Sequence, residues 1–218
     1  NRAIVQKYDA LTQSLFLDMF GDPVKNEKGW ETAILKNVTS KIGSGSTPRG
    51  GKESYKTEGI SLIRSMNVYD NEFYYKDLAF IDNIQADKLK NVIVEENDVL
   101  FNITGASVCR CTIVPKNILP ARVNQHVAII RPKKEILNYF FLNHLLISIQ
   151  VKRDLLKLGS GGGAVMEAIT KEQLENYHVI LPQIELQKQF AERVALIEAQ
   201  KQQAQLELAK SEELFNSL

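Results

Sequence analysis

The longest regular pattern of apolar positions lies at the C-terminal end of the chain. Residues 183–218 contain neither glycine nor proline and are rich in Gln, Glu, Ala, Leu and Lys, which favour helices. Steps of four and three residues connect a heptad seam whose apolar members are Phe190, Val194, Ile197, Ala204, Leu208, Phe215 and Leu218. A helix of this length would extend about 54 Å, more than the width of one domain. We therefore predict a projecting coiled-coil arm rather than a helix lying on its own domain.

A single apolar seam cannot bury itself, so the arm needs a second helix. Residues 2–20 predict a helix with Ile4, Tyr8, Leu11 and Leu15 on one stripe, ended by Gly21 and Pro23. Residues 10–15 and 213–218 share Leu, Ser and Leu, which suggests that one arm ends where another copy would begin. The chain is thus expected to be one unit of a longer cyclic arrangement. The partner of the seam is expected to be a helical N-terminal segment or a second copy of the chain.

The region between the two helical ends has a mixed pattern. Runs rich in Val, Ile, Thr and Phe predict strands at 30–41, 60–68, 91–103, 111–114, 123–130 and 177–181. Helical spacing covers 138–158 and stops at Gly159, while Thr170 and Gln173 predict a capping box. We expect an α+β fold with a mixed, mainly antiparallel sheet. The chain is therefore expected to consist of an N-terminal helical segment (1–22), a sheet domain (23–182) and a long helix (183–218).

Composition narrows the class of protein. With 218 residues, 44% hydrophobic and 24% charged, the chain suits one globular core. It has no apolar run of roughly 18 residues that could span a bilayer. Its two cysteines, Cys109 and Cys111, would point to opposite faces of a strand, so a reducing cytoplasm is expected rather than a disulfide.

The charged residues are sorted along the chain although the net charge is only +1. Residues 99–134 contain six basic and no acidic residues, and residues 32–68 contain six basic and two acidic ones. Residues 69–98 contain eight acidic residues and three lysines. This pattern predicts either a basic face suited to a phosphate backbone or segments that interleave so that their charges cancel. The two outcomes are about equally favoured by charge alone.

The sequence contains no recognisable catalytic, cofactor or metal constellation. Gly-x-Ser-x-Gly, His-Glu-x-x-His and a P-loop are absent, and His126, His144 and His178 are scattered. Residues 95–98 are the only candidate for the clustered carboxylates of a metal-dependent nuclease, and a solvated turn explains them better. We expect no catalytic residues, cofactor or metal.

Four loops combine hydrogen-bonding groups with basic residues. Such side chains contact phosphates or base edges of DNA, although for any single residue a role in capping a strand or turn is favoured, so the prediction rests on the occurrence of four such clusters. Flexible lysines suit phosphates, and arginine or amide side chains suit base edges. The candidate DNA-binding residues are Ser46, Thr47, Arg49, Lys52, Arg64, Asn67, Asn102, Thr104, Ser107, Arg110, Lys116, Arg122, Asn124, Gln125, His126 and Lys133.

Five segments in order along the chain resemble the specificity subunits of type I restriction–modification enzymes. They are residues 11–23, 42–48, 98–105, the glycines at 161–163 leading to Ile169 and Thr170, and residues 181–190. The resemblance implies a non-catalytic target-recognition domain that reads one half of a bipartite duplex DNA sequence, with the long helix as a ruler. It also implies methyltransferase and restriction subunits as partners and a chain that corresponds to half of a complete subunit, and it leaves homodimerisation through the long helix open.

Two other classes of function stay open from the sequence. A coiled-coil adaptor would bind protein rather than DNA, but it would not need a segment of 36 residues without a carboxylate. A nuclease would need a metal site that the sequence does not display.

Overall fold

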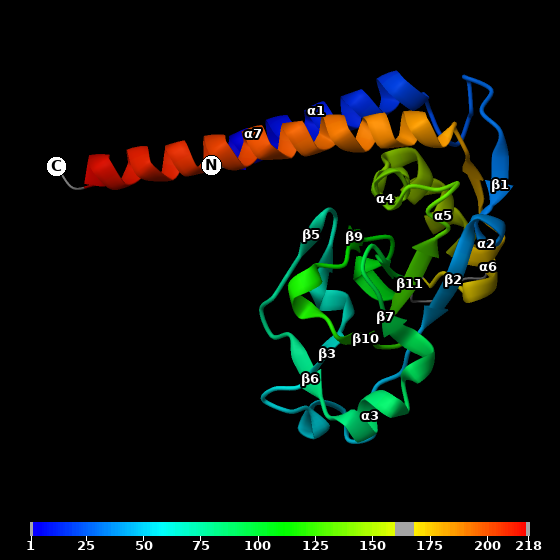
Figure 1. Ribbon diagram of the computed structural model, residues 1–218, viewed down its shortest axis with the longest axis vertical. Helices are drawn as coiled ribbons and strands as arrows, with labels where there is room; N and C mark the ends of the chain where they lie inside the picture. Colours follow the sequence, from blue (N-terminus) through cyan, green and yellow to red (C-terminus); the bar gives the residue numbers. More distant parts are fainter. Residues whose placement is uncertain (1, 160–167, 217–218) are drawn as a thin grey trace.

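The computed structural model describes residues 2–159 and 168–216, with side chains between residues 6 and 211 of these ranges. A helical arm projects from one end of an α+β domain (Figure 1). The arm consists of α1 (Arg2–Phe20) and α7 (Ile184–Asn216), which lie side by side and run in opposite directions. This architecture confirms the predicted α+β class and the long C-terminal helix. No helix in the described ranges is long and apolar enough to cross a membrane.

The seam of α7 packs against α1 of the same chain where the arm meets the domain. Phe190 and Val194 are fully buried, and Ile197, Ala204 and Leu208 are half-buried. Farther out, Lys201 forms an ion pair of 2.7 Å with Asp9 of α1. Of the two partners expected for the seam, the N-terminal segment is thus the one that the chain provides. The side chains of Phe215 and Leu218 lie outside the described residues.

The predicted apolar stripe of α1 is only partly buried: Leu15 packs against the core, and the side chain of Ile4 lies outside the described residues. Leu11 is 48% exposed, whereas Thr12, Phe16 and Phe20 are buried. A spacing of four residues places these three side chains on the face toward α7 and the domain. The leucines therefore lie beside the contact or outside it. Gly21 ends the helix with φ +75° and donates its backbone N–H to the carbonyl of Leu17, as the predicted C-terminal signal requires.

His144 of α4 (Tyr139–Ile147) lies beneath the arm and makes the stability of the protein depend on pH. Its ring contacts Phe190 and Phe140, and burial lowers the pKa of His144 to about 4 from 6.5. In the unfolded chain His144 binds a proton below pH 6.5, whereas in the folded chain it binds one only below about pH 4. The stabilisation by neutral His144 is therefore present above pH 6.5 and is lost as the pH falls to about 4, by about 3 kcal/mol.

Urea unfolding at pH 7 and pH 4 should show this loss when compared with the variant His144→Phe, which cannot titrate. The wild type should lose about 3 kcal/mol more than the variant over this interval. Equal losses in the two proteins would show that His144 does not titrate in this window.

The central sheet carries the main core of the domain. Its described strands have the antiparallel order β2 (Thr39–Ser44), β11 (Val127–Pro132), β8 (Val99–Asn102) and β9 (Cys111–Ile113). Ala128 and Ile130 of β11 belong to the hydrophobic core under the arm, whereas Val127 and Ile129 belong to a second core on the other face. Both faces of this strand are therefore buried, which explains its uninterrupted apolar sequence.

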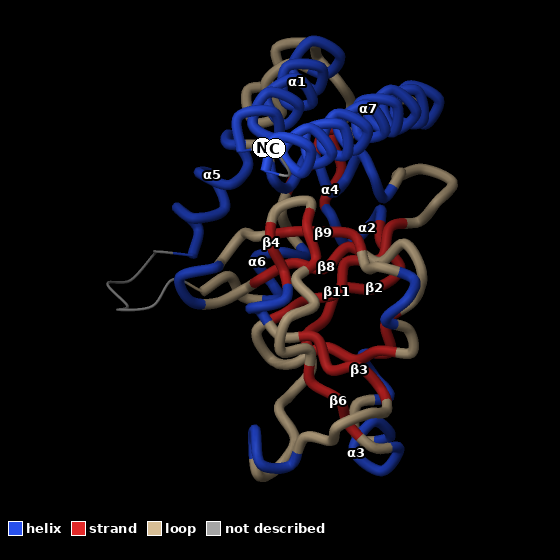
Figure 2. Tube along the Cα trace, turned by 90° about the vertical axis from the view of Figure 1, so that its left-hand side faces the viewer, coloured by secondary structure: helices blue, strands red, loops and turns tan. Residues whose placement is uncertain are grey.

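The outer sheet lies on the side of the central sheet away from the arm (Figure 2). Its order is β6 (Ala79–Ile81), β3 (Ile60–Ile63), β10 (Ala121–Val123) and β7 (Ile93–Val94). The β10–β3 pair is parallel and the other described pairs are antiparallel, which confirms a mixed, mainly antiparallel arrangement. The strands form separate sheets rather than the single sheet that we expected. Smaller antiparallel pairs join β1 (Thr32–Ile34) to β12 (His178–Ile180), and β4 (Val68–Tyr69) to β5 (Glu72–Phe73).

Several predicted elements are interrupted in the structure. The strand expected at 30–41 is divided by α2 (Leu35–Val38), and the one at 123–130 is divided by a turn between β10 and β11. The helix expected at 138–158 breaks at Ser148, whose ψ of 141° is not helical, and continues as α5 (Ile149–Gly159). The capping box of Thr170 and Gln173 is confirmed at α6 (Lys171–Glu175). A second one, at α3 (Asn83–Asp87), was not predicted.

Candidate nucleic-acid interface

The four polar loops come together where strands of both sheets end. In the central sheet, the end of β2 lies beside the start of β11, which lies beside the end of β8. In the outer sheet, β3 and β10 are parallel and end together at Ile63 and Val123. Hydrogen bonds of 3.0 Å join Asn124 to Gly45 and to Ile63. The four loops therefore meet at one surface, here called the loop junction, which is formed by residues 45–52, 64–67, 103–110 and 124–126.

Gly45 allows the loop after β2 to pack closely against the backbone at the end of β10. A Cβ atom at this position would lie 1.9 Å from the carbonyl oxygen of Val123. Any other residue would push the loop after β2 away from the loop after β10. The glycine thus explains how two loops that are 78 residues apart can share one surface, as the hydrogen bond between Thr47 and Gln125 shows.

A chain of side-chain hydrogen bonds crosses three of the loops. The Thr47 hydroxyl donates to Oε1 of Gln125, and the Gln125 amide lies 3.1 Å from Nε2 of His126. On the other side of the ring, Nδ1 of His126 lies 2.6 Å from the Thr104 hydroxyl. Which ring nitrogen of His126 donates and which accepts depends on the tautomer of the ring. The structure therefore brings together four of the predicted site residues.

A shallow hollow of about 380 Å³ lies beside this chain. Arg110 and Ser107 come from the loop before β9, and the Arg110 guanidinium lies 4.3 Å from the centre of the Tyr69 ring. No acidic residue lines the hollow, whose described lining is Ser65, Met66, Tyr69, Thr104, Gly105, Ala106, Ser107, Arg110 and His126. The surface thus presents a cation and several neutral hydrogen-bonding groups.

Asn67 and Asn102 do not reach this surface, which corrects their prediction as DNA-binding residues. Both side chains are fully buried. Asn67 donates to the carbonyl of Tyr74 and accepts from the backbone of Arg64, and Asn102 donates to the carbonyl of Ser65. Their amide N–H groups therefore hold the loops in place, whereas the buried Oδ1 of Asn102 has no hydrogen-bond partner in the described part of the chain.

Asn124 and Arg122 are also placed inside the fold rather than on its surface. Asn124 is 4% exposed and accepts from the backbone N–H of His126. Arg122 is 8% exposed and donates to the carbonyls of Ala86 and Ala121, and burial lowers its pKa. Neither side chain is available to DNA in this conformation, so these two predictions are corrected as well.

Arg64 is half-buried and already has a partner within the fold. It donates to the backbone carbonyl of Asp77, and its guanidinium lies 5.4 Å from the centre of the Tyr55 ring. Asp70, six residues farther along the chain, pairs with Lys152 of α5 and not with Arg64. Arg64 therefore lies at the edge of the loop junction and supports the fold, and Gln125 is better placed than Arg64 to contact a base edge.

The basic residues outside these loops are not brought to the loop junction. Lys116 forms an ion pair of 2.5 Å with Glu96, and Lys133 donates to the carbonyl of Asn37 beside α2. Arg49 and Lys52 are exposed on the loop that follows β2, as is Ser46. A continuous basic face across residues 99–134 therefore does not form.

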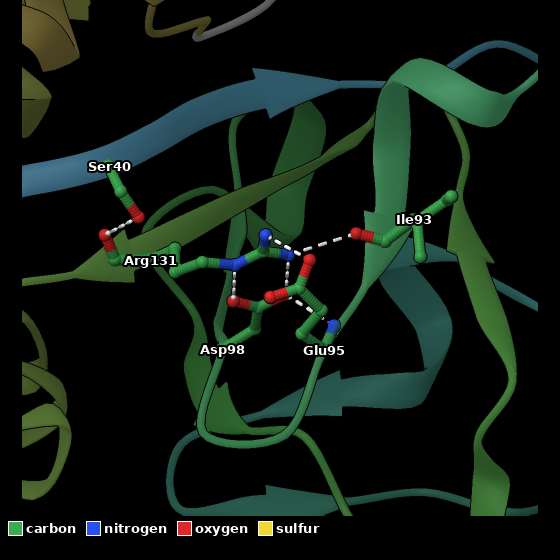
Figure 3. Close-up of polar contacts among 5 residues, drawn as sticks. All are labelled: Ser40, Ile93, Glu95, Asp98 and Arg131. Carbon is green, nitrogen blue, oxygen red and sulfur yellow. Dashed lines mark hydrogen bonds and ion pairs between the residues drawn. The ribbon is translucent and has the colours of Figure 1, made fainter.

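Arg131 and Asp98 show most clearly how the charged segments interleave (Figure 3). Asp98 is fully buried and accepts from Nε and Nη2 of Arg131 at 2.7 and 2.8 Å, while Glu95 contacts Nη1 of the same arginine. Burial raises the pKa of Asp98, and the guanidinium opposes this effect. The solvated turn predicted at 95–98 is thus wrong for Asp98. In the described ranges, no group of three or more His, Cys, Asp or Glu side chains could hold a metal ion.

Comparison with known proteins identifies the family. Residues 27–208 match the family described as "Type I restriction modification DNA specificity domain". The chain belongs to this family. The specificity domain is 30% identical over 193 residues to the type I restriction enzyme MjaX specificity subunit of Methanocaldococcus jannaschii, and 28% identical over 188 residues to the EcoBI specificity subunit of Escherichia coli. These matches include 83% and 85% of this chain but 40% and 38% of the relatives, so the chain spans well under half of their length.

The solved structures agree with the fold. The HsdS subunit from Thermoanaerobacter tengcongensis matches 94% of this specificity domain and 46% of its own chain, with a TM-score of 0.63 and 21% identity. The type I S subunit from M. genitalium matches 99% of this chain with the same TM-score and 12% identity. The resemblance found in the sequence is therefore confirmed at the level of family and fold.

Five residues of the specificity domain that line the hollow were not predicted: Ser65, Met66, Tyr69, Gly105 and Ala106. Tyr69 is the first residue of the acidic segment 69–98, and the negative charge of this segment argued against a contact with DNA. An aromatic residue directly after a basic loop is a signal that could have indicated it, because aromatic rings hold arginine side chains in place.

Proposed function

We propose that this specificity domain reads one half of a bipartite duplex DNA target within a type I restriction–modification complex, without catalysing a reaction itself. The observation that carries this proposal is the loop junction, where polar loops from both sheets form one surface without an acidic residue in its hollow. Membership of the family supports DNA over the alternative of a protein-binding adaptor.

The residues of the loop junction fall into two groups, those with side chains at the surface and those with buried side chains that bond to the fold. In this proposal the residues that contact DNA directly are Thr47, Thr104, Ser107, Arg110, Gln125 and His126, and the exposed Ser46, Arg49 and Lys52 of the loop that follows β2 add further contacts. Exposed lysines act as point charges on phosphates, whereas the hydrogen-bonded side chains are positioned firmly enough to favour base edges. The buried asparagines contribute by fixing the loops.

The arm fits the role of a spacer in this proposal. Thirty-three residues of α7 extend about 50 Å, comparable to about 15 base pairs of duplex. The arm would place the second half-site reader at a fixed distance and present helical surface to methyltransferase and restriction subunits in the cytoplasm. Homodimerisation through the outer part of α7 belongs to the same proposal.

Titration of a labelled duplex pool at two salt concentrations tests the proposal. Binding should weaken steeply with salt, and Lys52→Ala should weaken binding to all sequences alike and reduce the salt slope by about one unit. Lys188→Ala on the exposed side of α7 is the matched control and should bind as the wild type does. An affinity that does not change with salt concentration would contradict DNA binding through the basic residues. Cleavage of the duplex in the presence of Mg²⁺ would contradict a non-catalytic role.

A further inference from the structure

Arg110 differs from the other arginines of the basic segment 99–134. Arg122 donates to backbone carbonyls and Arg131 donates to Asp98, so both are committed to the fold. The Arg110 guanidinium donates to no group in the described part of the chain and forms no ion pair there. Its orientation is nevertheless restricted, because it lies 4.3 Å from the centre of the Tyr69 ring. A fixed guanidinium with free donors is what a base-reading arginine requires.

The ring beneath Arg110 is itself firmly held. Tyr69 ends β4 and pairs with Glu72 across the hairpin, and its ring contacts that of Tyr74 at a tilt of 38°, with ring centres 4.9 Å apart. The turn before β4 is fixed by the fully buried Asn67, which bonds to the carbonyl of Tyr74 at 2.8 Å. Because the hairpin and the turn are joined in this way, the platform for the guanidinium does not depend on a flexible side chain.

The surroundings of Arg110 favour a neutral acceptor pair over a phosphate. The described lining of the hollow contains no lysine and no carboxylate, but it offers the hydroxyls of Thr104 and Ser107 beside the guanidinium. A phosphate would be bound better with additional cations, which lie instead on the loop that holds Arg49 and Lys52. The edge of guanine in the major groove presents two adjacent acceptors, O6 and N7, that match one arginine fork.

We propose that Arg110 reads a guanine in the target half-site through O6 and N7, and that Tyr69 is the positioning residue that orients it. This inference rests on the proposed function and specifies the base that the loop junction selects. It predicts that the unknown half-site contains one guanine whose identity depends on a single side chain.

Selection of bound duplexes from a pool with a randomised centre tests this inference with the full chain. The wild type should enrich a motif with an invariant guanine, and Arg110→Ala should lose preference at that position alone. Affinity of the variant for the wild-type motif should fall roughly 10- to 100-fold. Replacing that guanine by 7-deazaguanine, which lacks the N7 acceptor, should weaken the wild type and leave Arg110→Ala unaffected.

Variants of the platform separate positioning from folding. Tyr69→Phe keeps the ring and should keep the guanine preference, whereas Tyr69→Leu should relax it at the same position, with melting curves recorded for both. Arg153→Ala on the exposed side of α5 is the control for loss of one arginine and should select the wild-type motif. A wild-type motif without a dependent guanine, or equal weakening of all sequences by Arg110→Ala, would overturn the inference but leave DNA recognition intact. Enrichment of no motif by the wild type would overturn the proposed function and the inference together.

Discussion

Replacing Phe190 with alanine should lower the free energy of unfolding by about 3–5 kcal/mol. Phe190 is fully buried where the arm meets the domain, and its ring centre lies 5.6 Å from that of Phe16 and 5.4 Å from that of Phe20. The truncation leaves a cavity among these rings that the surrounding helices cannot close, because α1, α4 and α7 all contribute to its walls. Urea unfolding followed by circular dichroism measures the loss.

Leu196→Ala provides the matched control on the same helix. Leu196 is 67% exposed, so its truncation should change stability by less than about 0.5 kcal/mol. A cost for Phe190→Ala no greater than that of the control would show that the arm is not packed on the domain as described.

Replacing Arg131 with leucine should cost about 3–5 kcal/mol, because Asp98 would remain buried without its partner. Asp98 has no exposed surface, and its two carboxylate oxygens each accept from the guanidinium. Protonation would relieve the unpaired carboxylate, so the deficit of the variant should shrink as the pH falls toward the ordinary carboxyl pKa of 3.8. Unfolding curves at pH 7 and pH 5 measure both effects.

A second ion pair of the same region is the control. Lys116 and Glu96 are 75% and 51% exposed, and an exposed pair contributes little, so Lys116→Met should leave the unfolding curve almost unchanged. The double variant Asp98→Leu with Arg131→Leu should recover much of the loss, since apolar residues tolerate burial without a partner. If Arg131→Leu were as stable as Lys116→Met, Asp98 would not depend on the arginine.

The helices of the arm could be predicted from sequence because their signals are local. The absence of Gly and Pro, the heptad spacing and the Gly21 terminus all lie within the segments that they describe. The face of α1 could not be predicted, because the four-residue spacing of Thr12, Phe16 and Phe20 competes with a leucine stripe of similar spacing. Only the packing partner decides which stripe is buried.

The loops of the candidate site could be identified from sequence, but the roles of their side chains could not. Asparagine suits a base edge and a backbone carbonyl equally well, and Asn102 bonds to Ser65, which lies 37 residues away. Contacts of that range are not visible in local patterns. The pairing of Arg131 with Asp98 could not be predicted either, because it also joins residues far apart in the sequence. This pairing removes a cation from the predicted basic face.

The double burial of β11 has a consequence for how the domain can change in evolution. Its alternate residues belong to two different cores, so almost any substitution within the strand disturbs one of them. The loops of the loop junction carry many side chains that neither core contains, apart from Ile103 and Cys109 of the first core and fixed positions such as Gly45 and the buried asparagines. Substitutions can therefore accumulate in these loops at little cost in stability. Two descendants of this chain could share the same scaffold and differ entirely in the surface that they present.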